Sequence, residues 1–268
     1  MLRQAMRGAY QHNVFFLASA LTFDAIIAAV PLVLLVLAIL GYVVNARLGG
    51  VREVHILFDR LLPSHGTGPN DPLAQAERLV TRVVAGRARL SAFGIPLFIW
   101  FGARFFGSVR AALHQIFGGP ASRPWLAGKS VDLLLVLVTL VWLIANTALT
   151  APAVDAGWSG RMAANTIAFV LGVGWFYVIY AFAPSRHAPR HAALIAAIFT
   201  ALAFRVAQRF YAIYVARFTT IDQLISDANA IALALFILWI YYSAFVFLLG
   251  AEVAVAYEGM TRGPEGKS

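Results

Sequence analysis

The chain contains no cysteine, and this absence excludes several kinds of chemistry. Without cysteine there are no disulfides, no thiolate metal sites and no cysteine nucleophile. Charged residues are also scarce: they make up 12% of the 268 residues, against about 25% in ordinary soluble domains. Hydrophobic residues account for 61%, and the mean hydropathy is +0.77. This composition predicts a polytopic membrane protein.

Acidic residues are few, 12 against 21 Lys and Arg, which gives a formal charge of +9. In a membrane protein such basic residues belong at helix ends that face anionic lipid. No basic stripe alternates with stacking aromatic residues, as a nucleic-acid-binding surface would require. Membrane lipids are therefore the predicted partners, and nucleic acid is not.

Catalytic and cofactor motifs are also missing. The chain has no G-x-S-x-G, no H-E-x-x-H and no Walker loop, which excludes an ATP-driven pump within this chain. The histidines are scattered, and Pro189 between His187 and His191 spoils a helical ligand pair. No second carboxylate is expected at the depth of Asp24 for an aspartyl mechanism. We therefore predict a protein that is not an enzyme and holds no metal or cofactor.

Long apolar runs are what the sequence does have. About 20 residues are needed to cross a bilayer as a helix. The runs predict an all-α fold with six transmembrane helices, over residues 15–44, 91–107, 131–149, 166–182, 192–218 and 230–257. The run at 91–107 is marginal in length. A single membrane domain over 1–257 follows, with a short polar tail over 258–268 and a short amphipathic lead-in over 1–14.

The long connection over residues 45–89 is rich in arginine. In it, VREVHILFDRLL carries apolar residues at helical spacing, which predicts one amphipathic helix. Asp71 and Pro72 are typical of an N-cap and a first helical residue, and Gly86 is typical of a helix end. Two short amphipathic helices are therefore predicted that do not span the bilayer and lie on the membrane surface or against the bundle.

Basic residues in the short connections alternate along the chain, and most fall on the side of both termini. The positive-inside rule then places both termini in the cytoplasm of a multi-pass bacterial inner-membrane protein. If the arginine-rich connection over 45–89 is counted too, the bias disappears.

Three segments resemble the YihY/virulence factor BrkB family of membrane proteins. They are ALTFDAIIAAVPLVLL in the first span, FGARFFGSVRAALHQIFG in the second, and ALFILWIYYSAFVFLLGAEVAVAYE in the last. The resemblance implies a six-helix inner-membrane protein linked to envelope integrity, lipid or amphiphile transport and serum resistance. An older label in the family is ribonuclease BN. Asp24 stands where the family often has an uncharged or aromatic residue, so its role is not carried over.

Two charges fall near mid-membrane by helix counting. Asp24 lies ~15 Å into the first span and Arg205 ~20 Å into the fifth, from the same side, at 1.5 Å per residue. A charge in hydrocarbon costs several kcal/mol, roughly 3 on insertion scales, and usually has a partner. An Asp24–Arg205 pair is the first hypothesis. It is either a structural ion pair or part of a hydrophilic path or headgroup site; the other alternative is no contact at all.

Small and basic residues recur every four positions in the fifth span, at Ala197, Ala201, Arg205 and Arg209. The alanines allow another helix to approach closely. Arginine's planar fork suits phosphate or carboxylate, so Arg205 and Arg209 are candidate ligands for an anionic headgroup. The alternative is that Arg209 simply reaches the outer interface.

A second pair is predicted between Arg104 and Glu252, near the cytoplasmic ends of the second and last spans. Small neighbours on both helices favour close packing, so the pair is predicted to be a helix-end clamp or inner gate. Pro31 and Pro96 each remove a backbone donor inside a span and are predicted to kink it.

These features together predict a transporter or flippase-like facilitator for an anionic amphiphile or envelope lipid. One alternative is a structural or scaffolding membrane protein that recruits envelope partners through residues 51–86. The other is a membrane-bound hydrolase or ribonuclease, as the older family label implies. The sequence does not distinguish a monomer from a homo-oligomer.

Overall fold

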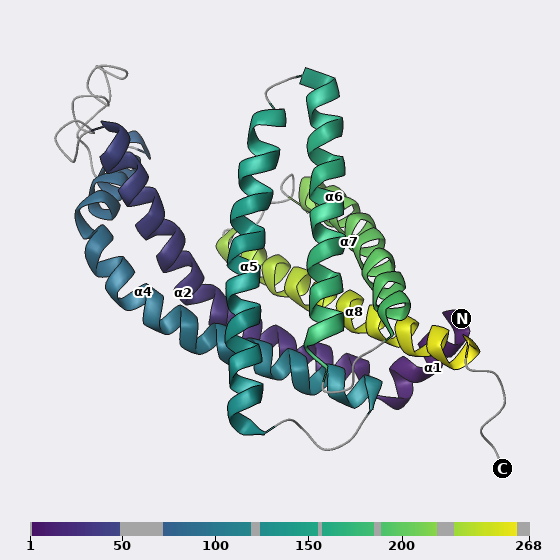
Figure 1. Ribbon diagram of the computed structural model, residues 1–268. Coiled ribbons are helices and arrows are strands. Elements are labelled where there is room, and N and C mark those ends of the chain that lie inside the picture. The colour runs from purple at the N-terminus through teal and green to yellow at the C-terminus, as the bar shows by residue number, and fades with distance from the viewer. Residues whose placement is uncertain are drawn as a thin grey trace, which may run out of the picture. The chain divides into compact units, whose positions relative to one another are not determined.

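The computed structural model describes residues 2–48, 72–118, 124–154, 157–184, 189–218 and 228–261. Every regular element in these ranges is an α-helix (Figure 1). Six helices contain stretches long and apolar enough to cross a membrane. The all-α fold with six spans, predicted from the apolar runs, is therefore confirmed. The elements are α1 (Leu2–Gln11), α2 (Val14–Leu48), α4 (Pro72–Phe117), α5 (Trp125–Val154), α6 (Gly157–Phe182), α7 (Arg190–Phe218) and α8 (Ala228–Thr261).

The chain forms two compact units, each described by itself. Unit 1 comprises Met1–Ile26 and Gly102–Ser268, and unit 2 comprises Ile27–Phe101. Helices α2 and α4 each contribute one part to each unit. The predicted single domain over residues 1–257 stays a prediction.

Helix α4 corrects the predicted organisation of the long connection. It runs without interruption from Pro72 to Phe117, whereas a break at Gly86 was expected. A glycine inside a helix costs only about 1 kcal/mol relative to alanine. No proline or turn residue follows it before the next apolar run, so the helix continues. The other predicted amphipathic helix, within residues 51–62, lies outside the described residues.

Helices α2 and α4 each continue through a proline inside a span. Pro31 lies inside α2, and Pro96 lies inside α4. The kinks predicted at these two residues stay predictions.

A tight turn joins the amphipathic helix α1 to the first span. Asn13 adopts a left-handed conformation, with φ of 53°, which asparagine tolerates better than most residues. The Leu17 amide donates to the Asn13 carbonyl at 3.1 Å, so α2 begins directly after the turn. His12 therefore lies at the junction between α1 and α2.

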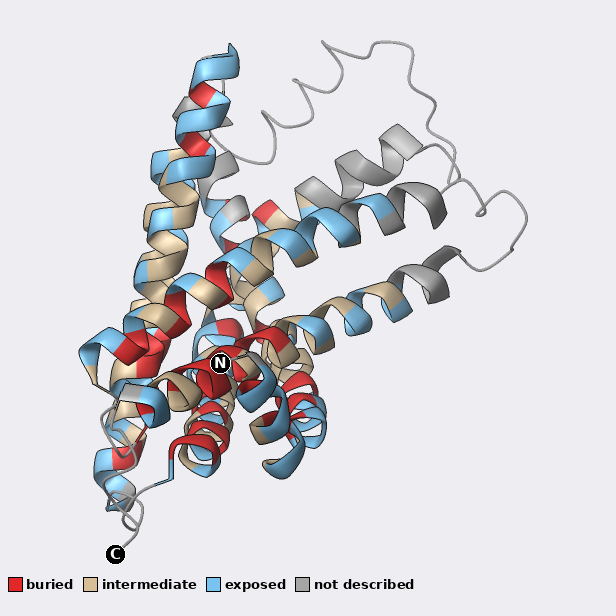
Figure 2. Cartoon of the chain, turned by 90° about the vertical axis from the view of Figure 1, so that its right-hand side faces the viewer, coloured by how far each residue is buried: buried red, intermediate tan, exposed pale blue. Residues whose placement is uncertain are grey.

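The core of unit 1 lies where α7 and α8 pack together and where α1 packs on α8. The buried residues of α7 are small and lie in its first half: Ala192, Ala193, Ala196, Ala197, Thr200 and Ala201. They face the second half of α8, where residues from Val246 to Ala254 are mostly buried. Small side chains let two helices approach closely in a membrane. Figure 2 shows the buried residues gathering around the end that carries the N-terminus.

Large apolar side chains are exposed along the spans of unit 1. Leu126 in α5, Phe210 in α7 and Trp158 in α6 are examples. A soluble monomer rarely exposes apolar surface so continuously. The pattern fits helices whose outer faces contact lipid tails.

Unit 2 pairs the second part of α2 with the first part of α4. A Cβ at Gly41 would lie 2.8 Å from the Val83 carbonyl oxygen, so the backbones are in close contact there. The Arg87 guanidinium lies over the Tyr42 ring, 5.7 Å from its centroid. Such a cation–π contact gives the guanidinium a partner other than a carboxylate.

Candidate functional site

Asp24 is bound by α4, not by α7. Its Oδ1 accepts a hydrogen bond from Arg104 Nε at 3.1 Å, and its Oδ2 accepts one from the Ser108 hydroxyl. The Asp24 side chain is 10% exposed and that of Arg104 is 55% exposed. Arg205 instead donates from Nη2 to the Asn165 carbonyl at 3.0 Å. The predicted Asp24–Arg205 pair is therefore wrong.

The reason lies in the length of α4. The predicted second span ended at Gly107, which placed Arg104 near the membrane surface. The helix continues to Phe117, so Arg104 lies about 20 Å from that end of the helix. That depth is close to the ~15 Å of Asp24 from the start of α2. Depth counting alone did not distinguish two arginines at similar depth on different helices.

Glu252 is bound by a histidine at the α1–α2 turn. His12 Nδ1 and Glu252 Oε1 lie 2.7 Å apart, and the Glu252 side chain is only 2% exposed. Gly8 of α1 faces the same carboxylate. The Gln115 amide donates to the His12 carbonyl at 3.2 Å, which places this end of α4 beside the turn. The predicted Arg104–Glu252 pair is therefore also wrong, because each residue has another partner.

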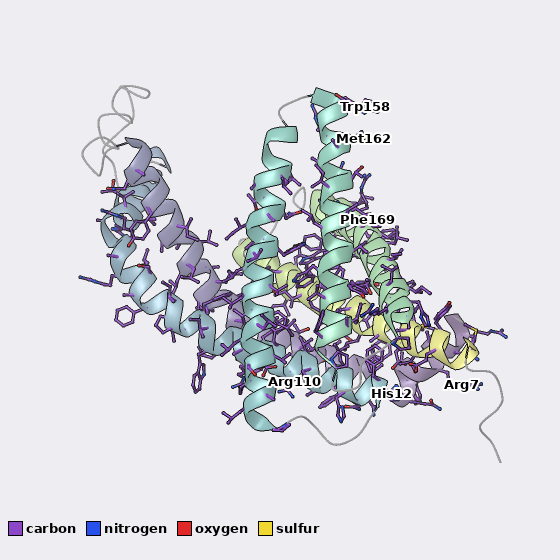
Figure 3. All side chains as sticks on the ribbon, viewed as in Figure 1. Arg7, His12, Arg110, Trp158, Met162 and Phe169 are labelled. Atoms are coloured by element: carbon purple, nitrogen blue, oxygen red, sulfur yellow. The ribbon has the colours of Figure 1, made fainter. Side chains whose placement is uncertain are left out.

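A third buried carboxylate was not singled out from the sequence. Asp132 in α5 is fully buried and accepts two hydrogen bonds from Arg110, Nε to Oδ1 at 3.0 Å and Nη2 to Oδ2 at 3.3 Å. Lys129 Nζ lies 3.9 Å from the same carboxylate. In Figure 3, Arg110 and His12 lie at the end of unit 1 opposite to Trp158.

Spacing could have indicated some of these partners. Ser108 follows Arg104 by one helical turn and so shares its face. Lys129 precedes Asp132 by three residues, a spacing typical of an ion pair on one helix. No local pattern pointed to His12, because its partner is 240 positions away. Long-range pairs of this kind depend on which helices pack together.

An apolar cavity of about 220 Å³ lies within unit 1, and we call it the inner cavity. Its walls come from α2, α4, α6, α7 and α8. They are mostly aromatic and aliphatic: Leu21, Ala25, Phe105, Phe106, Val109, Trp175, Phe176, Ile179, Phe204, Trp239, Ile240, Ser243, Ala244 and Phe247. Asp24 sits between two lining residues of α2, and Ser108 directly precedes one of α4. Asp24 and Arg104 thus directly precede the lining residues Ala25 and Phe105 in the chain, but neither charged residue lines the cavity itself.

A wider space of about 700 Å³ lies between α7 and α8, and we call it the outer hollow. It is lined by Ala207, Phe210, Tyr211, Ile213, Leu238, Trp239 and Tyr242. Arg209 is exposed and stands on α7 between two of these residues. Arg205 is half-buried and directly follows Phe204, a wall residue of the inner cavity. The structure does not join Arg205 to Asp24, and neither Arg205 nor Arg209 lines an apolar space, although each is next to a lining residue along α7.

In the part of the chain that the structure describes, no three His, Asp or Glu side chains gather as a metal site. Asp24, Asp132 and Glu252 are each held by basic or hydroxyl partners. This arrangement satisfies charge inside a bundle and leaves the cavity walls apolar.

Comparison with known protein families agrees with a bundle of membrane-spanning helices. The family model described as virulence factor BrkB matches residues 5–268. The chain belongs to this family. It is similar to a UPF0761 membrane protein of Rhodospirillum centenum, with 27% identity over 94% of this chain and 56% of that protein. The chain thus spans little more than half the length of that relative.

Other BrkB-family relatives cover less of the chain. The UPF0761 membrane protein YihY of Escherichia coli is 25% identical over 75% of this chain and 68% of its own length. YihY of Shigella boydii matches with the same identity and coverage. No solved structure matches the chain. Together with the six apolar spans, these relatives identify a multi-pass membrane protein.

The Asp24–Arg104 contact predicts a measurable coupling in this BrkB-family protein. In a double-mutant cycle, Asp24→Asn and Arg104→Gln should couple by about 1 kcal/mol, as polar contacts between membrane helices do. The free energy of unfolding in mixed micelles with rising dodecyl sulfate gives the measurement. Asp24→Asn and Arg205→Gln should instead be additive. A larger coupling to Arg205 than to Arg104 would show that the observed pairing is not the one in the membrane.

Proposed function

We propose that the protein binds an anionic amphiphile, such as a phospholipid or an envelope lipid precursor, and moves it within the membrane. The observation that carries the proposal is the inner cavity, whose lining residues Ala25 and Phe105 directly follow Asp24 and Arg104 in the chain. An engineered apolar cavity of about 150 Å³ binds benzene, so a chamber of about 220 Å³ has room for part of a hydrocarbon chain. Its aromatic walls offer no ligands to a small ion.

The two arginines of α7 support the proposal that the bound amphiphile is anionic. Arg205 and Arg209 stand within the same turns of α7 that line the two apolar spaces. A guanidinium binds phosphate or carboxylate through two parallel hydrogen bonds. A lipid whose chain occupied these spaces would bring its headgroup to the helix that carries both arginines. The chain supplies no nucleotide-binding loop, so movement would follow an existing gradient or equilibrate the two leaflets.

Filling the inner cavity tests the proposal. Ala244 lines the cavity, so Ala244→Phe should place a ring in it and slow lipid movement about tenfold, equivalent to ~1.4 kcal/mol in the barrier. The purified protein is reconstituted in vesicles with a fluorescent phosphatidylglycerol. A reductant that cannot cross the bilayer then reports how fast the lipid changes leaflet.

Ala234→Phe is the matched control, because Ala234 is exposed on the same helix. It adds an identical ring outside the cavity and should leave the rate unchanged. A native protein that moves the lipid no faster than protein-free vesicles would contradict the proposed function. That result would favour the scaffolding alternative, in which residues 51–86 recruit partners.

A further inference from the structure

Trp239 stands at the boundary of the two apolar spaces. Its side chain lines both the inner cavity and the outer hollow. On the inner side its ring contacts Phe204 edge to face, with centroids 5.4 Å apart. On the outer side it contacts Tyr211, with centroids 4.8 Å apart. One indole ring, in contact with one aromatic ring from each space, therefore borders both spaces.

The two spaces differ in how they meet the surroundings. The outer hollow is lined by exposed residues of the spans, including Phe210 and Tyr242. In a bilayer the medium outside this face is lipid tails. The inner cavity is lined by buried residues such as Phe176 and Phe247, together with half-buried ones. An apolar chain that reached the inner cavity through the hollow would pass the position of Trp239.

We propose that Trp239 is the gate through which one acyl chain of an anionic phospholipid passes from the outer hollow into the inner cavity. This inference rests on the proposed function and names the route of its substrate. The occupant is an acyl chain because both spaces are apolar and the outer one faces the membrane interior. Its headgroup is anionic because α7 carries the exposed Arg209 directly before Phe210, which lines the hollow.

Rotation of the indole ring is enough to open the route. Trp239 is only half-buried, and aromatic pairs of this type add only modestly to the stabilisation from burial. The Ser243 hydroxyl donates to the Trp239 backbone carbonyl at 2.8 Å, within the helix. The backbone of the gate therefore stays fixed while the side chain moves.

A photoactivatable phosphatidylglycerol with a diazirine in its acyl chain tests the gate. The full-length protein is reconstituted in phosphatidylcholine vesicles containing this probe, and labelled residues are located by mass spectrometry. In the native protein, we expect labelling mainly on outer-hollow residues of α7. Trp239→Ala should raise labelling of the inner-cavity residues Ser243 to Phe247 about tenfold, as expected for a step made ~1.4 kcal/mol easier.

Labelling of Phe210 and Ile213 is the internal control, since it should not change when the gate is removed. Trp239→Leu is a second variant, smaller than tryptophan and apolar, in case alanine destabilises the bundle. Trp175→Leu widens the inner cavity without opening it toward the hollow, and should not raise inner labelling. A phosphatidylcholine that carries the same diazirine chain should label the outer-hollow residues less than the phosphatidylglycerol probe does. Arg209→Gln should remove this difference between the two lipids.

Three results would overturn the gate. These are equal inner labelling in native and Trp239 variants, increased labelling with Trp175→Leu, and labelling by neither lipid. The failure of the proposed function is distinguishable. If Trp239→Ala opens the cavity to the chain but the native protein moves no lipid between leaflets, the gate stands and the transport proposal fails.

Discussion

Replacing Arg110 by methionine should lower the free energy of unfolding by about 3–5 kcal/mol, the range measured when one partner of a buried ion pair is removed. Asp132 is fully buried, and Arg110 binds both of its carboxylate oxygens. Without Arg110, the nearest remaining cation is Lys129, at 3.9 Å from one oxygen. Because Lys129 partly compensates the charge of Asp132, we expect a loss of unfolding free energy near the lower end of that range. Unfolding by dodecyl sulfate in mixed micelles measures the effect.

Two further variants distinguish the effect of breaking the ion pair from the effect of removing one positive charge. Arg161→Gln removes one positive charge from an exposed position of α6 and should change stability by less than about 0.5 kcal/mol. The double variant Arg110→Met with Asp132→Leu removes both charges, and should lie within about 1 kcal/mol of the native protein because no charge is left unpaired. An Arg110→Met variant as stable as the native protein would show that Asp132 is not buried in the membrane.

Replacing Gly250 by alanine should cost about 3 kcal/mol, at the upper end of the usual range for overpacking. A Cβ at this position would collide with the Thr200 hydroxyl and lie 2.6 Å from the Tyr180 hydroxyl oxygen. Both hydroxyls are fixed: Tyr180 lies 2.8 Å from Thr200 Oγ1 and donates to the Phe247 carbonyl at 2.6 Å. The added methyl group would therefore separate α7 from α8 or break these bonds.

Thr200→Ala should partly rescue the Gly250 variant. Alone, it removes one hydrogen bond at a cost of about 1 kcal/mol, while Tyr180 keeps its bond to Phe247. In the Gly250→Ala background it removes the closest clash, so the double variant should be more stable than Gly250→Ala alone. Gly259→Ala is the matched control on the same helix, because nothing lies within 4 Å of its Cβ position. It should be neutral or stabilising by up to about 1 kcal/mol. Equal losses at both glycines would refute the packing explanation.

The two large effects share a physical cause with the corrected pairs. Several buried polar groups of unit 1 are bound by residues from other helices, often across more than twenty positions of sequence. Asp24 with Arg104, and His12 with Glu252, are such cases. In hydrocarbon, an unpaired polar group is costly, so each finds the partner that the packing brings near. A substitution that removes the partner, or that fills the space between helices, should therefore lower the stability of the protein.

The sequence by itself determined the six apolar spans and the family. Apolar runs of bilayer length admit only helices, since every backbone polar group must be satisfied within its own segment. It also predicted that Asp24 needs a partner, because a charge at that depth is expensive. The second span was predicted to end at Gly107, whereas the apolar stretch of α4 extends to Phe117, which brings Arg104 closer to the depth of Asp24.

Only the tertiary structure decided which partner each charge has. The depth of a residue along a helix follows from counting residues. Which side chains become its neighbours depends on how closely small residues such as Ala197 and Gly250 let the helices approach. The same packing makes the apolar spaces on either side of Trp239. No pattern along one helix encodes a cavity with walls from five helices, because its shape is set by side chains far apart in sequence.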